Sequence, residues 1–481
     1  MALTKMETKL GRSGYTVLKR DLSPDELQAC KKELTLEVTP KDVIRVYREN
    51  TSKLYIPKHY GYERFGLPSN SIPVSNTWTT PVEFCGSLRE HQHKPVQVCI
   101  DNLTKSPTPG GILQLYCGAG KTTCALYLIS QIKVKTLVIV HKEFLMAQWR
   151  ESIAKFLPSA QVGRIQQNVV DTENKHIVLG MLKSLAMKDY SFDVFSQFDL
   201  VIIDECHFVC SKTFSKALFK MAGSKYTLGL SATPNRADSM ERIFLWHLGP
   251  VLYAMKREEV KCDVKVYNYA EAKGTYTETK NKRGDIQVST MMTQVITNGY
   301  RTYFIGKLIL NAFFGEEYPK RKVLVLSERR THLEHILRCM KEEKKRRGET
   351  REITCGYFYG GLSEEDRARS AECNVILGTY QMASVGLDID GLNTLVLATS
   401  KPGIIRNAEG AQITGSMEQS VGRIFRKAHT AVMPLIIDIA DKFSVFSSQA
   451  YKRIQFYRQC NYTIETFKAK ENEKEEKVEV S

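Results

Sequence analysis

A glycine-rich turn between an apolar run and a helical run is the feature that most constrains the fold of this chain. Residues 111–116 suit a buried strand, and residues 123–129 have the composition of a helix. Between them lies Gly118-Ala119-Gly120-Lys121-Thr122. A strand, a glycine turn and a helix in this order direct backbone N–H groups and the helix N-terminus to one point, which suits a phosphate group.

The turn also predicts roles for two side chains. In a phosphate-binding loop, Lys121 would reach the β- and γ-phosphates of a nucleotide, and Thr122 would bind Mg²⁺. The general pattern of such loops begins with a further glycine, and Leu115 occupies that position here. The alternative is a tight turn that carries Gly-Lys-Thr without binding a nucleotide.

Composition and charge narrow the class of protein. The 481 residues exceed one ordinary domain, and 42% hydrophobic residues suffice for full cores. Beside a phosphate loop, the formal net charge of +16 indicates a nucleic-acid partner, although it also serves solubility. The twelve cysteines are scattered as in a reduced protein, and Cys206 and Cys210 lack the two further ligands that a zinc site needs.

No targeting segment is recognisable in the sequence. No apolar run is long enough to span a membrane, and the N-terminus lacks the apolar core of a signal peptide. We therefore expect a cytoplasmic or nuclear protein that is not secreted and has no membrane partner, with packaging in a virion left open.

Two stretches of strand–helix alternation organise the chain. Apolar runs typical of buried parallel strands lie at 111–116, 136–140, 176–179, 200–203 and 226–230, and again at 323–326, 354–358, 374–377, 394–397 and 435–439. This pattern predicts an α/β fold with helices on both faces of each sheet. The predicted parts are an N-terminal accessory module (1–84), a first lobe (85–255), a linker or insertion (256–300), a second lobe (301–460) and a charged tail (461–481). Within the tail, residues 468–481 are expected to be disordered or a frayed helix.

An acidic pair follows one of these runs. Asp204 and Glu205, in Asp204-Glu205-Cys206-His207, come directly after the run 200–203, where an α/β sheet binds its ligands. Asp204 would hold Mg²⁺, and Glu205 would polarise an attacking water. An acidic pair at an ordinary strand end is the alternative. The tripeptide at 231–233 follows the next run and could relay the state of a nucleotide to another surface.

Two arginines stand out in the second half. Arg423 and Arg426 would share one face of a helix and suit a triphosphate held by the other half of the chain, in the manner of an arginine finger. A basic surface helix is the alternative. Asp388 could position an arginine or contact a ribose. Trp149 and Phe144 could touch nucleic acid, although aromatic residues at helical spacing are more often part of a core.

In their order, these motifs resemble those of superfamily 2 helicases. The matching segments are LREHQ (88–92), CGAGKT (117–122), HKEFLMAQW (141–149), DECH (204–207), SATP (231–234), VLSER (325–329), the loop 379–388 and QSVGRIFR (419–426). The chain is similar to the XPB-like and RecG-like DNA translocases and to the helicases of large DNA viruses, including the poxvirus transcript-release helicase. Ala237 departs from the Arg-Glu-Asp triplet of XPB, and Cys206 departs from the usual alanine.

The resemblance implies two tandem RecA-like lobes that bind ATP and Mg²⁺ between them. The implied site residues are Gln92 (adenine), Gly118, Ala119, Gly120, Lys121, Thr122, Thr123, Asp204 and Glu205 in the first lobe, and Asp388, Gln419, Arg423 and Arg426 in the second. The implied activity is movement along DNA, or unwinding of DNA, without sequence preference and with 3′→5′ polarity. The implied processes are transcription, repair or recombination, alongside transcription or replication proteins. A DExH RNA helicase, and a motor or scaffold subunit of a larger nucleic-acid complex, are the alternatives.

Overall fold

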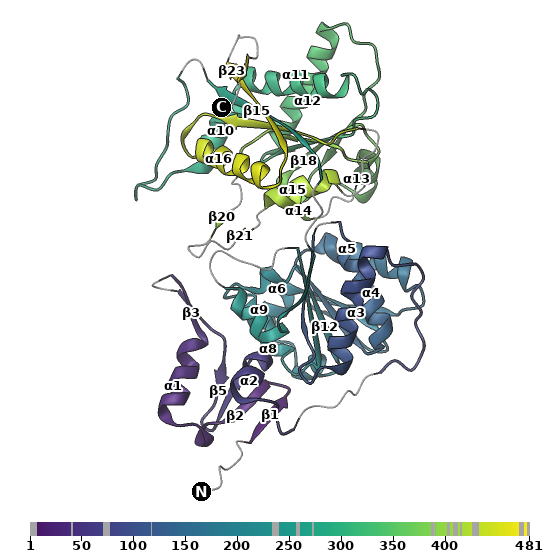
Figure 1. Ribbon diagram of the computed structural model, residues 1–481, viewed down its shortest axis with the longest axis vertical. Helices are drawn as coiled ribbons and strands as arrows, with labels where there is room; N and C mark the ends of the chain where they lie inside the picture. Colours follow the sequence, from purple (N-terminus) through teal and green to yellow (C-terminus); the bar gives the residue numbers. More distant parts are fainter. Residues whose placement is uncertain are drawn as a thin grey trace. The chain divides into compact units, whose positions relative to one another are not determined.

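The computed structural model describes residues 7–39, 42–70, 77–116, 118–232, 240–255, 260–271, 274–385, 389, 391–401, 405–406, 412–413, 416–425, 432–470 and 476–478. The chain divides into two compact units, Met1–Lys256 with Asn407–Ala411, and Arg257–Arg406 with Gln412–Ser481. Each unit contains one eight-stranded sheet. Figure 1 shows how helices and strands are arranged within each unit. Within the described ranges, no helix is both long enough and apolar enough to cross a membrane.

The sheet of the first unit is almost entirely parallel. Its strand order is β10-β9-β11-β8-β12-β13-β7-β14. The five central strands coincide with the predicted apolar runs: β11 (Ile177–Met181), β8 (Thr136–Val140), β12 (Leu200–Asp204), β13 (Tyr226–Ser231) and β7 (Gly111–Leu115). The edges are β9 (Val162–Gln166) with β10 (Val169–Asp171), and β14 (Val251–Met255). Because β12, β13 and β7 are parallel neighbours, the acidic pair and the glycine turn emerge at the same edge of the sheet.

Helices cover both faces of this sheet. One face carries α3 (Glu90–Lys105), α4 (Lys121–Ile132) and α5 (Glu143–Phe156), and the other carries α6 (Leu182–Met187), α8 (Ser215–Lys220) and α9 (Glu241–Leu248), as Figure 1 shows. The short α7 (Phe192–Ser196) and the 3-10 helix η2 (Cys206–Val209) complete the lobe. Helices on both faces explain why the central strands are apolar throughout rather than alternating.

The N-terminal module is a small α+β unit. Its four-stranded sheet has the order β1 (Thr8–Gly11), β2 (Gly14–Leu18), β6 (Lys53–Ile56) and β5 (Arg48–Glu49). The 3-10 helix η1 (Lys19–Asp21), the helices α1 (Pro24–Glu33) and α2 (Lys58–Phe65), and the hairpin of β3 (Thr35–Thr39) and β4 (Asp42–Arg45) surround it. The serine-capped start of α1 is a capping box formed by Ser23 and Glu26.

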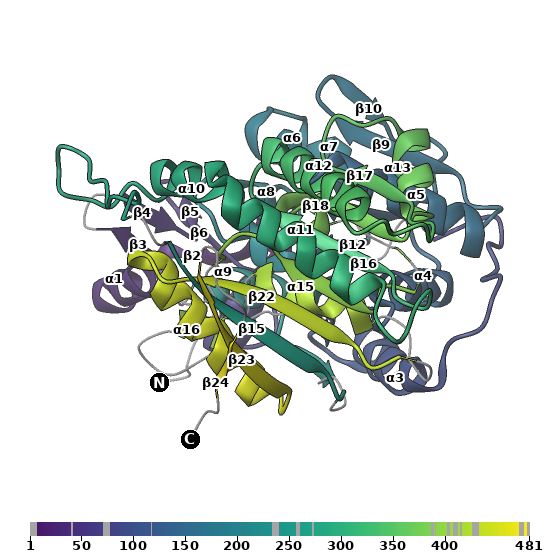
Figure 2. The same ribbon diagram turned by 90° about the horizontal axis from the view of Figure 1, so that it is seen from above.

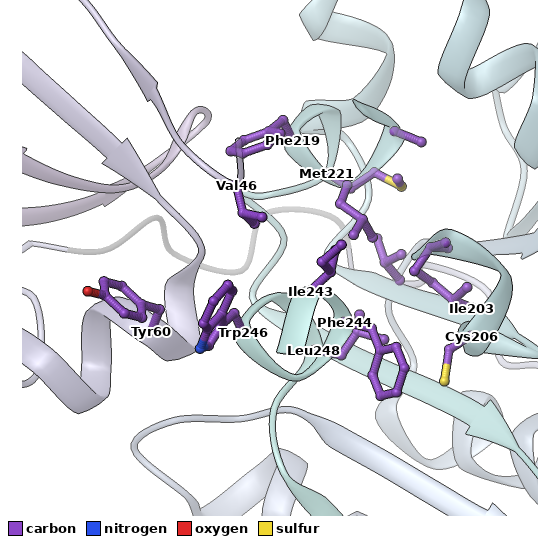
Figure 3. Packing of buried hydrophobic residues seen from close by; sticks show 14 of the residues in the cluster. Val46, Tyr60, Ile203, Cys206, Phe219, Met221, Ile243, Phe244, Trp246 and Leu248 are labelled. Carbon is purple, nitrogen blue, oxygen red and sulfur yellow. The ribbon is translucent and has the colours of Figure 1, made fainter. Parts of the chain in front are cut away.

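The core of the module is continuous with that of the first lobe. One hydrophobic cluster includes Tyr15 and Val46 of the module together with Phe244 and Trp246 of α9. The Tyr60 and Trp246 rings meet edge to face, with centroids 5.6 Å apart. Figure 3 shows these two side chains near each other. The shared burial of apolar side chains therefore stabilises the module on the lobe.

A buried ammonium group reinforces this contact. Lys58 is 2% exposed. Its Nζ donates to the carbonyl oxygens of Lys225 at 2.9 Å, Ser224 at 3.2 Å and Pro109 at 3.4 Å. Burial lowers the pKa of Lys58 to about 7. Three carbonyl acceptors at the start of β7 and β13 are the partners that such a buried cation needs.

The second unit repeats the architecture with strand order β17-β18-β16-β19-β22-β15-β23-β24. Five strands coincide with the predicted runs: β17 (Cys355–Phe358), β18 (Val375–Thr379), β16 (Val323–Ser327), β19 (Thr394–Leu397) and β22 (Leu435–Asp441). The other three are β15 (Asp263–Ala270), β23 (Thr463–Lys470) and β24 (Glu476–Val478).

Two sequence predictions differ from this sheet. β15 lies in the segment 256–300, which we expected to be a linker or insertion, and it pairs in parallel with both β22 and β23. β23 and β24 lie in the segment 461–481, which we expected to be a charged tail with residues 468–481 disordered or in a frayed helix. The polar residues of β23 hid its strand character, because its sequence lacks the continuous apolar run of a strand that is covered on both faces.

Helices flank the second sheet as well. Figure 2 shows α11 (Gly299–Phe313) beside α12 (Arg330–Arg346), and both pack in the cluster that contains Val325 and Ile437. The opposite cluster contains residues of α14 (Tyr380–Val385), α15 (Ser416–Val421), the 3-10 helix η3 (Gly422–Phe425) and α16 (Ser444–Gln459). The remaining elements are α10 (Val288–Thr297), α13 (Glu364–Ala371), β20 (Ile405–Arg406) and β21 (Gln412–Ile413).

Two buried ion pairs lie at β22. Arg453 of α16 contacts Asp438 through Nε and Nη2, both at 2.8 Å, and both residues are at most 1% exposed. Arg301 of α11 contacts Asp441 at 2.6 and 2.8 Å. These bidentate pairs fix the helices against the sheet, since neither charge is tolerated in the core alone.

Candidate active site

The glycine turn has the backbone of a phosphate loop. Gly118 and Gly120 have φ values of 92° and 86°, and α4 begins at Lys121. Gly120 caps the helix without a side chain, so the first-turn N–H groups of residues 121–123 face the opening of the loop. A residue with a Cβ would be strained at Gly120 and would place that atom 2.1 Å from Gln92 Nε2.

Gln92 supports the loop from α3. Its Nε2 donates to the Ala119 carbonyl at 2.8 Å, and its Oε1 accepts from the Arg89 N–H at 2.8 Å. Gln92 is 2% exposed, so this amide is part of the wall behind the loop. Sequence reasoning assigned Gln92 to adenine, and its contact with the phosphate loop was not foreseen. The contact between Gln92 and adenine stays a prediction.

Lys121 and Glu205 face each other across the loop. Lys121 Nζ lies 3.6 Å from Glu205 Oε1 and 3.4 Å from the Leu115 carbonyl oxygen. The two side chains are 12% and 16% exposed, so both are largely buried but not closed off from solvent. Burial raises the pKa of Glu205, but Lys121 and the nearby histidines outweigh burial and keep the pKa below its ordinary value. Glu205 is therefore ionised at neutral pH.

The Asp204 carboxylate is oriented by Trp149. The indole Nε1 of Trp149, in α5, donates to Asp204 Oδ2 at 2.9 Å. Trp149 is 1% exposed and Asp204 is 8% exposed. Burial and then the charge of Glu205 raise the pKa of Asp204 to about 6, while Trp149 and Lys121 act in the opposite direction. The suggestion that Trp149 touches nucleic acid is wrong, because the ring is in the core.

The segment after Asp204 links the acidic pair to the next strand. Glu205 has a φ of 48°, a left-handed conformation that costs a non-glycine residue about 1–2 kcal/mol. His207 Nδ1 lies 3.2 Å from Ser231 Oγ and 3.5 Å from Glu205 Oε2. Ser231 thus contacts the Asp-Glu-Cys-His segment directly, and this contact is compatible with the predicted relay. Thr233 lies outside the described residues.

One aromatic contact beside this segment was missed from the sequence. The rings of His141 and Phe208 stack with centroids 3.9 Å apart and an interplanar angle of 22°. Burial lowers the pKa of His141 to about 4, so the ring is neutral. The available signal was the position of His141 directly after the apolar run 136–140, where a sheet presents its ligand-binding residues.

The predicted residues of the second lobe are only partly described. Arg423 lies in η3 rather than in an α-helix and is 5% exposed. Gln419 belongs to α15, and its side chain lies outside the described part of the structure. Arg426 and Asp388 lie outside the described residues. The shared face of Arg423 and Arg426 therefore stays a prediction.

The residues of the first lobe fit a nucleotide with its metal. The loop offers N–H donors from a glycine-capped helix, Lys121 offers a cation, and Asp204 offers a carboxylate oxygen at the same sheet edge. Thr122 follows Lys121 in the first turn of α4 and can supply a hydroxyl oxygen. Oxygen ligands of this kind suit Mg²⁺.

Comparisons with known proteins agree with this geometry. Residues 86–236 match the family model of the type III restriction enzyme res subunit, and residues 305–428 match that of the helicase conserved C-terminal domain. Helicase L396 of Acanthamoeba polyphaga mimivirus, whose name describes an ATP-dependent RNA helicase, is 31% identical over 98% of this chain and 89% of its own length. Helicase QP509L of African swine fever virus (isolate Pig/Kenya/KEN-50/1950), similarly named, is 26% identical over 84% of this chain and 79% of its own length.

Solved structures show the same fold at low sequence identity. A fragment of an HsdR subunit of a type I restriction enzyme from Vibrio vulnificus YJ016 matches 82% of this chain and 71% of its own, with a TM-score of 0.55 and 16% identity. Mycobacterium smegmatis helicase Lhr, solved with single-stranded DNA and AMP-PNP, matches 76% of this chain and 48% of its own, with a TM-score of 0.51 and 14% identity. The two α/β units are therefore tandem RecA-like lobes, and the chain belongs to the superfamily 2 helicases, ATP-dependent and nucleic-acid-dependent enzymes, where it is related to the helicases of large DNA viruses.

Proposed function

We propose that this helicase hydrolyses ATP with Mg²⁺ to move along or unwind DNA, in the 3′→5′ direction and without sequence preference. The observation that carries the ATPase part is the pair of Lys121 Nζ and Glu205 Oε1, 3.6 Å apart, beside the buried Asp204. A cation for phosphates and two carboxylates at one sheet edge are the parts that phosphoryl transfer to water requires.

Each residue has a proposed role. Lys121 holds the phosphates, together with the N–H groups of Gly118, Ala119, Gly120, Thr122 and Thr123. Thr122 and Asp204 hold Mg²⁺, which neutralises charge on the phosphates when bound. Glu205 orients the attacking water, which is consistent with its lowered pKa. Gln92 and Asp388 contact the nucleoside, and Gln419, Arg423 and Arg426 of the second lobe stabilise charge in the transition state.

RNA is the second candidate substrate. It is favoured by the names of helicases L396 and QP509L, which describe RNA helicases. DNA is favoured by the motifs that resemble those of XPB-like and RecG-like translocases. The net charge of +16 suits either polymer, because it acts on phosphates. The proposal includes a role in viral transcription, repair or recombination. The enzyme would act there alongside transcription or replication proteins, or as a motor subunit of a larger complex.

An ATPase titration with single-stranded DNA, tailed duplex DNA and the matching RNAs tests the choice of substrate. We expect a larger increase in kcat with DNA, and a larger increase with RNA would reverse the assignment. Unwinding of duplexes with either a 3′ or a 5′ tail then tests polarity.

Two variants test the assigned roles. Lys121→Ala should abolish ATP hydrolysis while nucleic-acid binding persists, and wild-type turnover in this variant would contradict the phosphate-loop assignment. Arg423→Ala should lower kcat with ATP affinity retained. Loss of ATP affinity alone would contradict the finger role.

A further inference from the structure

A groove lies between the N-terminal module and the first lobe, and its lining residues belong to none of the helicase motifs. One wall is formed by residues 43–48, from β4 to β5, and the other by residues 212–219, which include most of α8. The groove has a volume of about 540 Å³. Its two walls belong to one compact unit and share one hydrophobic cluster, which includes Val46 and Phe219 (Figure 3).

Four cationic side chains line the groove. Arg45 and Arg48 come from the module, and Lys212 and Lys216 come from the lobe. No acidic residue is among the described residues that line it. Glu49, the acidic neighbour of Arg48, is engaged elsewhere, because its Oε2 lies 2.7 Å from both Lys19 and Lys31. Arg45, Arg48 and Lys216 therefore face no carboxylate among the described residues that line the groove.

The sequence reinforces this charge on the lobe side. Between Glu205 and Asp238 the chain contains no acidic residue, while Lys212, Lys216 and Lys220 follow one another at intervals of four. Ordinary solvated helix faces mix both signs of charge, as α3 does with its exposed Asp101–Lys105 pair. A run of one sign beside a groove is instead typical of a surface that binds a polyanion.

Arg48 is held in a defined position within the groove. Its guanidinium carbon lies 4.7 Å from the centroid of the Phe219 ring, and Phe219 is 5% exposed. Partial burial lowers the pKa of Arg48. Among the described residues, no hydrogen bond or ion pair engages this guanidinium. Stacking occupies its flat face and leaves the N–H donors of its edge for an external acceptor.

A phosphodiester backbone fits these features better than a single small anion. The cations lie on two facing walls, so that several charges spaced along one ligand can be bound together. Tyr47 and Phe219 add aromatic surface among the cations, a combination used for nucleic-acid strands. The chain also belongs to a family that binds nucleic acid. A nucleic acid bound by the helicase lobes is therefore a polyanion available to the groove.

We propose that the groove lined by Arg45, Arg48, Lys212 and Lys216 binds the sugar–phosphate backbone of a nucleic acid as a second contact, outside the motor motifs. This inference rests on the proposed function, because the motor supplies the nucleic acid. Contacts with phosphates carry no sequence information, so this site adds affinity and salt dependence but no specificity.

The test compares two double variants from which the same amount of charge is removed. Arg45→Ala with Lys216→Ala removes one exposed cation from each wall, while Lys32→Ala with Lys53→Ala removes two exposed cations of the module that do not line the groove. Binding of a fluorescein-labelled tailed duplex DNA, its single strand and the matching RNA is measured between about 50 and 200 mM salt. ATPase activity is measured at saturating nucleic acid.

The groove variant should bind all probes more weakly, and the slope of log K against log salt concentration should fall by about 1 for each phosphate that the variant no longer neutralises. The control variant should keep the wild-type slope, and both variants should keep the wild-type kcat at saturation. The same slope in both variants would overturn the groove assignment while leaving the motor intact. A wild-type protein that neither binds nucleic acid nor responds to it would instead overturn the proposed function. Equal weakening in the two variants would show only a general effect of charge and would also overturn the proposal.

Discussion

The hydrogen bond from Trp149 to Asp204 gives a sharp test of how the active site is positioned. Replacing Trp149 by Phe keeps an aromatic ring in the core but removes the N–H that lies 2.9 Å from Asp204 Oδ2. Both residues are buried, at 1% and 8% exposure, so water does not readily replace the missing donor. A hydrogen bond to a charged acceptor contributes about 1.5–3 kcal/mol. If this energy orients the carboxylate for Mg²⁺, the concentration of Mg²⁺ needed for half-maximal ATPase activity should rise about 10- to 150-fold.

A matched substitution separates this effect from the change in ring size. Trp78→Phe makes the same chemical change at an indole Nε1 that is buried with no hydrogen-bond partner among the described residues. The Trp78 ring meets the His176 ring edge to face, with centroids 5.2 Å apart. The Mg²⁺ titration and the urea unfolding midpoint are measured for both variants. A Trp149→Phe enzyme with the same Mg²⁺ requirement as Trp78→Phe would refute the positioning role, whatever its stability.

Three further substitutions test other parts of the structure. His247 lies among Lys58, Arg48, His59 and Phe219, and burial lowers its pKa to about 3. Below pH 6.5 this histidine is therefore protonated in the unfolded chain but stays neutral in the folded chain. Lowering the pH from 6.5 to 5 should therefore cost about 2 kcal/mol of stability through this residue, and His247→Phe should flatten the pH dependence of urea unfolding over that range. Arg453→Leu leaves Asp438 buried without its bidentate partner and should destabilise the second lobe by about 3–5 kcal/mol, whereas the double change with Asp438→Leu should recover much of this in the unfolding midpoint. Gly120→Ala should weaken ATP binding, measured by fluorescent-nucleotide titration, because of the φ of 86° and the clash with Gln92. Full ATP affinity in Gly120→Ala would contradict the loop geometry.

The central strands were predictable from the sequence because each is covered on both faces. Such strands are continuous apolar runs, as in Leu200–Asp204 and Val323–Ser327, and a run of this kind has few other stable structures. β15 and β23 were not predicted because they carry polar residues at alternate positions, which resemble a linker or a tail when read alone. Their pairing in parallel, Asp263 with Thr463 through Ala270 with Lys470, joins segments that no local pattern connects.

The sequence predicted which residue types form the site, but it did not predict the residues that hold them in position. Lys121, Asp204 and Glu205 lie in motifs whose order identified the superfamily, and the structure brings all three to one sheet edge. The residues that hold them there belong to other helices: Trp149 of α5 for Asp204, and Gln92 of α3 for the loop. Hydrogen bonds between distant helices follow from tertiary packing, which periodicity does not encode.

In the N-terminal module, too, tertiary packing that the sequence pattern does not encode determines where functional side chains lie. Taken alone, the alternation of residues 43–48 favours one continuous strand. The structure instead divides these residues between β4 and β5 around Val46, which packs into the core shared with the first lobe. That break places Arg45 and Arg48 together on the wall of the groove. Burial of Val46, Tyr60 and Lys58 against the lobe thus fixes the module and at the same time sets the position of its cations. A module held only by a flexible linker would present the same charges without a defined groove, so the apolar interface is what turns a basic sequence into a candidate binding site.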